Sequence, residues 1–356
     1  TFPHQVRKCC SATIAKTCTT AKPCPHSLLP NDALSNANIR RVCVCVCEES
    51  KGVLVPADQC TTFREQPENK DLRPTHPVCC AVFQSDQTCG RLSQYADEFS
   101  FDSRETQLDQ FPWAAMVLLR RVQKLVCSGS LIASRFVLSA AHCFVDVRGT
   151  TTDYRVRLGD WDLELDEDCL YVRGQLVCNE QQPVDYAVER IISHGDFQRQ
   201  RRDFLHDIAL LKLAEAVEYG AQIGPACLPN WNVGVPLIAG QKFTVFGWGR
   251  TRSYSGVRRK YKIEMPGRNI SACVRAYGLR APEVPRIHLC VGGVYRKDVC
   301  HGDSGGALMR RESNRWVQEG IVSFGAYRCG KPLPGVYTNV AHYIDWIQWA
   351  IDVSSS

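Results

Sequence analysis

The sequence predicts an all-β protein: a β-barrel domain that ends in one helix and follows a small disulfide-rich module. Three observations lead to this prediction. From residue 111 onward, short apolar runs alternate with Gly and Asn turns, and the last residues carry apolar side chains at helical spacing. In contrast, residues 1–88 hold ten of the twenty cysteines and have almost no sustained apolar periodicity.

Strands are expected where Val, Ile, Leu and Phe gather between turn residues. Examples are residues 136–140, 208–213 and 320–324. We therefore expect an all-β barrel domain over residues 111–356.

The end of the chain predicts one amphipathic helix that packs on the barrel domain. Six apolar side chains recur three or four positions apart: Tyr343, Ile344, Trp346, Ile347, Ala350 and Ile351.

The amino-terminal part predicts a separate module over residues 1–88. Its many Pro, Thr, Asn and Lys residues and its ten cysteines suggest a small fold held together by disulfides. Residues 90–110 are rich in Ser, Asp, Glu and Gln, which predicts an exposed linker between the modules. The expected division is 1–88, a linker and activation region over 89–110, and 111–356.

The composition limits the classes of function. A net charge of +6 on 356 residues, with no zinc-finger or RNA-binding motif, argues against nucleic acid as a partner. No apolar run is long enough to cross a membrane. Nothing in the sequence calls for a cofactor.

The twenty cysteines predict an oxidising compartment, and hence a secreted, extracellular protein. No signal peptide precedes Thr1, which is what a processed chain would show. Asn269-Ile270-Ser271 is an acceptor triplet for N-glycosylation, a modification of secreted proteins.

Three short segments carry reactive side chains. They are Leu-Ser-Ala-Ala-His-Cys ending at Cys143, His-Asp-Ile-Ala-Leu-Leu starting at His206, and Asp-Val-Cys-His-Gly-Asp-Ser-Gly-Gly ending at Gly306. A serine hydroxyl is a poor nucleophile unless an imidazole takes its proton and a buried carboxylate orients the imidazole. Ser304, His142 and Asp207 can fill these three roles.

All three segments resemble the signature motifs of chymotrypsin-fold serine proteases, and the resemblance runs from about residue 111 to the end. It implies two β-barrels and Ser-His-Asp peptide hydrolysis. It also implies an oxyanion hole formed by the backbone amides of Gly302 and Ser304. Ser323 and Gly325 resemble the strand that supports Asp207 and pairs with the substrate backbone.

The resemblance also implies a specificity. Asp298 matches the residue at the base of the family's primary pocket, and Gly325 and Gly335 match its walls, so protein substrates with Arg or Lys before the cleaved bond are expected. Val299 replaces the small hydroxyl residue common in trypsins and removes a hydrogen-bonding partner for a lysine ammonium. This predicts a preference for Arg over Lys.

Five disulfides are implied by the resemblance alone, because spacing does not determine connectivity. The pairs are Cys127 with Cys143, Cys169 with Cys178, Cys273 with Cys290, Cys300 with Cys329, and Cys89 with Cys227. The last would tether the amino-terminal module after a cut in the linker.

The remaining ten cysteines resemble an arthropod clip domain, because a terminal Cys79-Cys80 pair precedes a protease. They are Cys9, Cys10, Cys18, Cys24, Cys43, Cys45, Cys47, Cys60, Cys79 and Cys80. In the segment from Cys43 to Cys47, cysteines alternate with valines at a spacing tighter than that of the usual clip domain. Three alternatives therefore stay open for this module: a diverged clip, one and a half clips, or thiolate metal binding. The architecture resembles proteases of arthropod haemolymph cascades, which implies other cascade proteases and serpin-type inhibitors as partners.

The sequence departs from the family at the activation switch. Family zymogens are cut after Arg or Lys, and the new Ile or Val ammonium pairs with the aspartate before the nucleophile, here Asp303. The matching position is near Ser100-Phe101, no Ile-Val-Gly-Gly follows a basic residue there, and the linker offers only Arg91 and Arg104. Burying Asp303 without a cation is expected to be costly or to displace it. Two hypotheses stay open: an endopeptidase activated in an unusual way, and a non-catalytic homologue that acts as a cofactor or regulator.

Three weaker signals predict exposed loops. The basic runs Arg199, Arg201, Arg202 and Arg258, Arg259, Lys260 are expected to be solvated, with polyanion binding or self-cleavage as alternatives. Asp160, Asp162, Glu164 and Asp166 predict an acidic surface loop, with calcium binding as the alternative. His206 and His301 flank the reactive residues and are expected to be exposed, with a place along the substrate as the alternative.

Overall fold

A computed structural model describes most of the chain from residue 77 onward. The described residues are 46–47, 52–56, 60, 77–92, 104–122, 124–145, 153–172, 174–198, 200–201, 203–230, 239–249, 258–282, 284–295, 299–326 and 329–355. The chain forms two compact units, one of Thr1–Phe83 with Tyr343–Ser356 and one of Gln84–His342.

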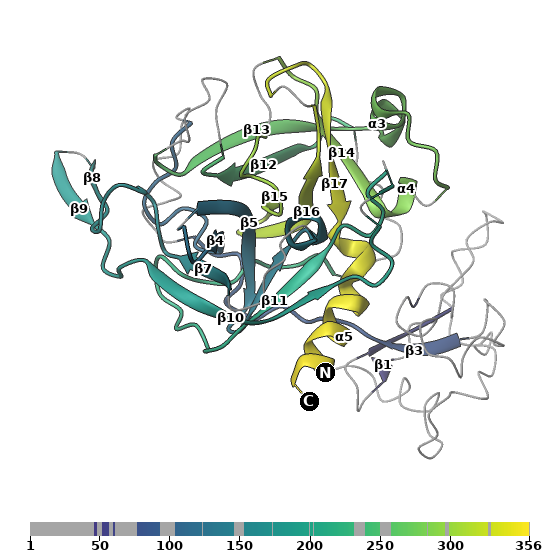
Figure 1. The fold of residues 1–356 in the computed structure, drawn as a ribbon, viewed down its shortest axis with the longest axis horizontal. Coiled ribbons are helices and arrows are strands. Elements are labelled where there is room, and N and C mark those ends of the chain that lie inside the picture. The colour runs from purple at the N-terminus through teal and green to yellow at the C-terminus, as the bar shows by residue number, and fades with distance from the viewer. Residues whose placement is uncertain are drawn as a thin grey trace, which may run out of the picture. The chain divides into compact units, whose positions relative to one another are not determined.

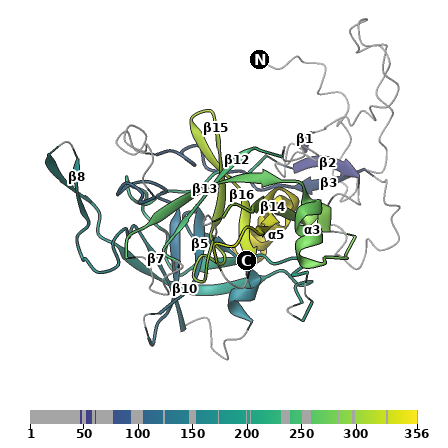
Figure 2. The same cartoon turned by 90° about the horizontal axis from the view of Figure 1, so that it is seen from above.

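The larger unit contains two closed six-stranded antiparallel barrels (Figures 1 and 2). The first has the strand order β10-β11-β6-β5-β4-β7. Its strands are β4 (Ala114–Leu119), β5 (Lys124–Ala133), β6 (Phe136–Ser139), β7 (Tyr154–Leu158), β10 (Val184–Ser193) and β11 (Ala209–Leu213). The core-facing runs of β6 and β11 are buried throughout, which explains their unbroken apolar sequence.

The second barrel has the strand order β12-β13-β14-β17-β16-β15. Its strands are β12 (Lys242–Gly247), β13 (Tyr261–Arg268), β14 (His288–Gly292), β15 (Ala307–Glu312), β16 (Arg315–Phe324) and β17 (Pro334–Asn339). The predicted all-β fold with two barrels is confirmed. The three predicted runs lie in β6, β11 and the second half of β16.

Short helices and one hairpin complete the larger unit. The helical segments are η5 (Ala141–Phe144), α3 (Ile270–Tyr277), α4 (Val284–Ile287) and η7 (Val340–Tyr343), whose last residue already belongs to the smaller unit. The hairpin of β8 (Cys169–Val172) and β9 (Gln175–Cys178) extends away from the barrels in both views (Figures 1 and 2).

Aromatic side chains join the two barrels. Phe111 is fully buried, and its ring stacks on that of Phe246 in β12 at a centroid distance of 4.4 Å. The ring of Trp316 in β16 meets Phe111 edge-on at 5.2 Å. Contacts of this kind fix the two barrels relative to each other, and the reactive residues come from both of them.

The linker is not exposed along its whole length, so that prediction was wrong in part. Thr106 and Gln110 are 2% and 3% exposed, and Leu108 is also buried. Residues 104–106 pair with the start of β13, since Thr106 N donates to Lys260 O and Lys262 N donates to Arg104 O. Polar composition suggested exposure, but backbone pairing buries these polar residues. The domain boundaries 1–88, 89–110 and 111–356 stay predictions.

Cys89 and Cys227 form the predicted disulfide, and the following Gly90 is held by backbone hydrogen bonds to Pro225 and Trp316. A cut between Cys89 and residue 111 should therefore leave one covalent molecule. We expect one band on a non-reducing gel and two bands after reduction. The variant with Cys89→Ser and Cys227→Ser should give two bands in both lanes, whereas one band there would indicate another bridge.

The smaller unit contains a three-stranded sheet and the C-terminal helix. Strands β1 (Val46–Cys47), β2 (Gly52–Pro56) and β3 (Pro77–Ala81) pair in that order. Helix α5 (Ile344–Ser355) confirms the predicted helix, and its buried residues include Ile344, Trp346, Ile347 and Ala350 from the predicted face. Its packing on the barrel domain stays a prediction. Within the described part, no helix is long and apolar enough to cross a membrane.

A disulfide joins Cys60 and Cys80 in the smaller unit. The other eight cysteines of the predicted clip-like module lie where the structure describes no side chains: Cys9, Cys10, Cys18, Cys24, Cys43, Cys45, Cys47 and Cys79. The three hypotheses for this module, namely a diverged clip, one and a half clips, and thiolate metal binding, rest on cysteines outside the described side chains and stay predictions.

Candidate active site

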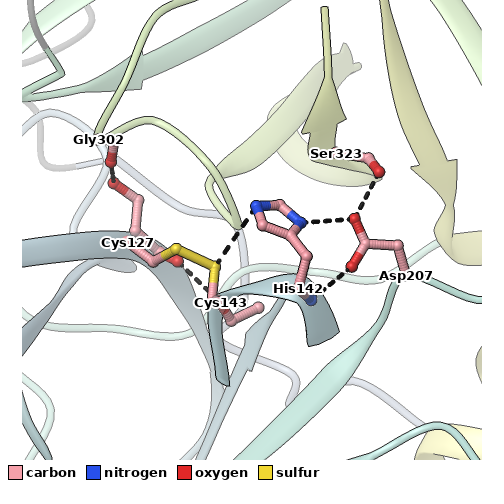
Figure 3. Close-up of a disulfide and its surroundings, with 8 residues drawn as sticks. Cys127, His142, Cys143, Asp207, Gly302 and Ser323 are labelled. Atoms are coloured by element: carbon pink, nitrogen blue, oxygen red, sulfur yellow. Dashed lines mark hydrogen bonds and ion pairs between the residues drawn. A yellow bond between two sulfur atoms is a disulfide. The ribbon is translucent and has the colours of Figure 1, made fainter. Parts of the chain in front are cut away.

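His142 and Asp207 meet at one edge of the first barrel. His142 lies in η5 directly after β6, and Asp207 lies just before β11, which pairs with β6. The Asp207 Oδ2 atom is 2.7 Å from His142 Nδ1, and Oδ1 accepts from the His142 backbone N–H at 2.8 Å (Figure 3). With its proton on Nδ1, the imidazole keeps a lone pair on Nε2.

The second barrel supports the Asp207 carboxylate, which is fully buried. Ser323 in β16 donates its hydroxyl to Asp207 Oδ2 at 2.5 Å (Figure 3). Thr338 in β17 donates its hydroxyl to the Asp207 carbonyl at 2.8 Å. The first bond fixes the orientation of the carboxylate, and the second fixes the main chain that carries it.

A disulfide lies against the imidazole. Cys127 in β5 and Cys143 in η5 are joined, and Cys143 Sγ is 3.9 Å from His142 Nε2 (Figure 3). The bridge links η5 to the barrel wall and so restricts where His142 can move.

Ser304 lies in the turn before β15, and the first barrel holds this turn. Ser128 in β5 donates its backbone N–H to Ser304 O at 2.7 Å and its hydroxyl to Gly302 O at 2.8 Å. Gly302 has φ = +103°, a conformation that other residues rarely adopt. Among the described residues, the Ser304 hydroxyl makes no hydrogen bond, and such contacts are often loose before substrate binds.

Asp303, next to Ser304, is fully buried in its expected place rather than displaced. Burial raises the pKa of this carboxyl to about 6, whereas hydrogen bonds from Tyr261, Cys300 and Gly249 lower it. The buried carboxylate is therefore accommodated by neutral donors.

The predicted specificity residues are described only in part. A Cβ atom added to Gly325 would lie 3.8 Å from Gly335 Cα, so the two glycines are neighbours. Val299 packs against the core of the second barrel. Asp298 lies outside the described residues.

A row of aromatic rings leads from His142 to a cavity, a feature that the sequence analysis missed. The Phe204 ring meets the His142 ring edge-on at 6.0 Å, Phe324 lies 5.3 Å from Phe204, and Tyr277 lies 5.6 Å from Phe324. The cavity beyond has a volume of about 560 Å³ and is lined by Arg201, Asp203, Tyr277, Gly278, Leu279 and Arg280. Phe204 and Phe324 each lie within three residues of a predicted site residue, and this closeness in sequence could have indicated that their rings lie near the site.

The five implied disulfides are all present, and they include the bridges of Cys169 with Cys178, Cys273 with Cys290, and Cys300 with Cys329. In the described part, every cluster of His, Cys and acidic side chains close enough to share a metal ion contains two cysteines of one disulfide, either one of these five or the Cys60–Cys80 bridge. A bridged sulfur is not a thiolate, so these clusters do not form thiolate metal sites.

The basic run at residues 258–260 is solvated only in part, because Arg258 is exposed as predicted whereas Lys260 is buried. Asp162 is fully buried and accepts from Arg258 Nε at 2.5 Å and from Arg259 Nε at 3.1 Å. Lys260 is 3% exposed, and burial lowers its pKa to about 8, although Asp160, Asp109 and Asp168 oppose that shift. This run holds the Asp162 segment by ion pairing.

The acidic loop is exposed only in part. Asp160 and Asp162 are buried, and burial raises the pKa of Asp160 to about 6, whereas Glu164 and Asp166 are exposed. The alternation of acidic and apolar residues in this segment did not indicate that Asp160 and Asp162 would be buried and form ion pairs with arginines.

The other weak signals have mixed outcomes. Arg201 forms a two-point ion pair with Asp203, while Arg199 and Arg202 lie outside the described residues. His206 is half-buried, and its ring stacks on that of His194 at 4.7 Å, whereas His301 is exposed as predicted. Asn269 is exposed, and its side chain caps α3 by accepting from Ser271 N.

Comparisons with known proteins agree with this geometry. The family model described as Trypsin matches residues 101–347. The CLIP domain-containing serine protease B15 of Anopheles gambiae is 37% identical over 283 residues, which cover 78% of this chain and 75% of that protein. Phenoloxidase-activating factor 1 of Holotrichia diomphalia is 39% identical over 68% of this chain and 67% of its own length. Melanization protease 1 of Drosophila melanogaster is 39% identical over 68% of this chain and 63% of its own length.

Proposed function

Because the chain belongs to the trypsin family of serine proteases, we propose that it is a secreted endopeptidase that cleaves proteins after Arg or Lys. The observation that carries the proposal is the contact of His142 Nδ1 with the buried carboxylate of Asp207, which Ser323 supports from the other barrel. This arrangement suits an imidazole that takes a proton at Nε2 and stabilises the charge it then acquires.

In the proposed reaction, Ser304 Oγ attacks the carbonyl carbon of the cleaved bond while His142 Nε2 takes the hydroxyl proton. The amides of Gly302 and Ser304 would donate to the oxygen that becomes negative. His142 then returns the proton to the leaving amine, and a water molecule hydrolyses the acyl-enzyme by the same steps. Asp207 keeps its charge throughout and holds the imidazole.

The physiological setting is proposed from the relatives. One is named for activating phenoloxidase and one for melanization. We infer that this chain acts in an extracellular proteolytic cascade of that kind, with other cascade proteases and serpin-type inhibitors as partners. The clip-like module would serve those contacts. Secretion is supported by the described disulfides, which persist in oxidising compartments.

The test is labelling and turnover. The protein is treated with a fluorophosphonate probe and with an Arg-containing chromogenic peptide, before and after limited digestion of the linker. Labelling at Ser304 together with peptide cleavage supports the proposal. Absence of both in every preparation contradicts it and supports the non-catalytic homologue, which the missing Ile-Val-Gly-Gly sequence in residues 89–110 favours.

Turnover should be faster after Arg than after Lys. Val299 offers no hydroxyl to a lysine ammonium, so kcat/KM for a matched pair of peptides should favour Arg by about 3- to 10-fold. Val299→Ser should raise turnover of the Lys peptide, and Val299→Ala should not. Equal rates for the two peptides in the unaltered protein would contradict this preference.

A further inference from the structure

The carboxylate of Asp303 is held entirely by neutral groups among the residues that the structure describes. Its Oδ2 atom accepts from the Tyr261 hydroxyl at 2.5 Å and from the Cys300 backbone N–H at 2.9 Å. Its Oδ1 atom accepts from the Gly249 backbone N–H at 3.0 Å. Within this described part, no Lys or Arg nitrogen forms an ion pair with it.

The surroundings leave the carboxylate little freedom. A Cβ atom added to Gly249 would lie 2.4 Å from the Asp303 carboxyl carbon, and one added to Gly247 would lie 2.5 Å from Oδ1. The carboxylate therefore fills space that two glycines of the second barrel leave open. Any other residue at Gly249 would collide with it.

Tyr261 is fixed on both sides. It is the first residue of β13, is 9% exposed and pairs with Gly247 of β12. On its other edge it forms a bridge with Glu105, which lies in the predicted linker. Because both neighbours hold its backbone, the hydroxyl is presented to Asp303 at a defined position.

The turn that carries Ser304 depends on this carboxylate. The Asp303 backbone N–H donates to Cys300 O at 3.0 Å, and the Gly306 N–H donates to Asp303 O at 2.9 Å. Together with the side-chain contact to Cys300 N, these bonds close the turn over residues 300–306. Holding the carboxylate therefore holds Gly302 and Ser304.

We propose that Tyr261 is a positioning residue that takes the place of the new amino terminus, so that the uncut chain already has an ordered turn and a reactive Ser304. The inference rests on the proposed function. It accounts for a chain that keeps His142, Asp207 and Ser304 but has no Ile-Val-Gly-Gly sequence after Arg91 or Arg104.

The experiment measures the rate at which a fluorophosphonate labels the uncut full-length chain, whose integrity is checked on a reducing gel. The unaltered protein should label. Tyr261→Phe keeps the ring but removes the hydroxyl, which leaves a buried carboxylate oxygen with one donor fewer, and should slow labelling by about 10- to 100-fold. The control Tyr171→Phe removes a hydroxyl from a residue that is 73% exposed and should label at the unaltered rate.

Two further measurements separate positioning from a general structural role. A free Ile-Val dipeptide supplies a terminal ammonium and should restore labelling of the Tyr261→Phe protein, whereas acetyl-Ile-Val should not. The acid limb of the labelling rate should also move to higher pH in Tyr261→Phe, because the lost hydroxyl favoured the ionised form of Asp303. Thermal unfolding should occur near the temperature of the unaltered protein.

The outcomes distinguish this inference from the proposed function. Equal labelling of the uncut unaltered and Tyr261→Phe proteins overturns the role of Tyr261. Labelling of the unaltered protein only after a cut in the linker overturns the inference and leaves the proposed function intact. Failure of the dipeptide to restore a Tyr261→Phe protein with unaltered melting behaviour also overturns it. Absence of labelling in every cut and uncut preparation contradicts the proposed function itself.

Discussion

Replacing Ser304 by alanine is expected to lower kcat for an Arg-containing peptide by about 10⁴- to 10⁶-fold. The hydroxyl is the only proposed nucleophile, and without it no acyl-enzyme forms. Ser304 is half-buried, and its carbonyl accepts from Ser128 at 2.7 Å, so a backbone bond that the substitution does not touch keeps the turn in place. The variant should therefore fold, bind substrate and fail to cleave it.

The measurement is the initial rate of peptide cleavage, together with fluorophosphonate labelling and a thermal melt. Ser134→Ala is the control, because Ser134 is exposed in the turn before β6 and takes no part in the proposed chemistry. It should leave the rate unchanged. Cleavage by Ser304→Ala at a rate close to that of the unaltered protein would mean that another residue is the nucleophile.

Replacing Asp207 by asparagine is expected to lower kcat by about 10⁴-fold, with a small effect on KM. The carboxylate accepts from His142 Nδ1 at 2.7 Å and from the His142 backbone at 2.8 Å. An amide in the same place can present its NH₂ group to Nδ1. The imidazole proton then moves to Nε2, and the atom that should accept the serine proton no longer can.

This loss is distinguishable from a loss of stability. Asp207→Asn keeps the size of the side chain. Its amide oxygen at the Oδ1 position still accepts from the His142 backbone N–H, the Ser323 hydroxyl can turn to accept from the NH₂ group at the Oδ2 position, and Thr338 still donates to the main chain. The control Asp185→Asn alters an exposed aspartate of β10 that pairs with Arg157 and takes no part in the proposed chemistry. It should change neither kcat nor KM. The proposed role of Asp207 would be contradicted if kcat fell in both variants in proportion to the loss of melting temperature.

The sequence was sufficient where the relevant signal is local. His142, Asp207 and Ser304 each lie in a short motif, and the resemblance of those motifs to chymotrypsin-fold proteases predicted their roles; the structure brings His142 and Asp207 into contact. The barrel strands followed from apolar runs between turns, and α5 followed from its helical spacing.

The remaining features depend on pairs that are distant in sequence and have no motif of their own. Tyr261 and Asp303 lie 42 positions apart, and only the pairing of β12 with β13 brings the hydroxyl to the carboxylate. Arg258 and Asp162 are 96 positions apart, and a basic run gives no sign that it meets a buried acid. Polar composition likewise conceals the burial of Thr106 and residues 108–110, next to the segment that pairs with the start of β13.

The pairing of residues 104–106 with β13 gives the linker a defined anchor point. If the chain were cut upstream of Arg104, the residues between the cut and Arg104 would limit how far the new amino terminus could reach. A terminus four residues before Arg104 can lie at most about 14 Å from it. A terminus made by a cut after Arg91 could sample a far larger volume, so its effective concentration at any one point would be lower. The site of the cut would thus set the effective concentration of the new ammonium at Asp303, and with it how strongly the cut chain competes with the Tyr261 hydroxyl.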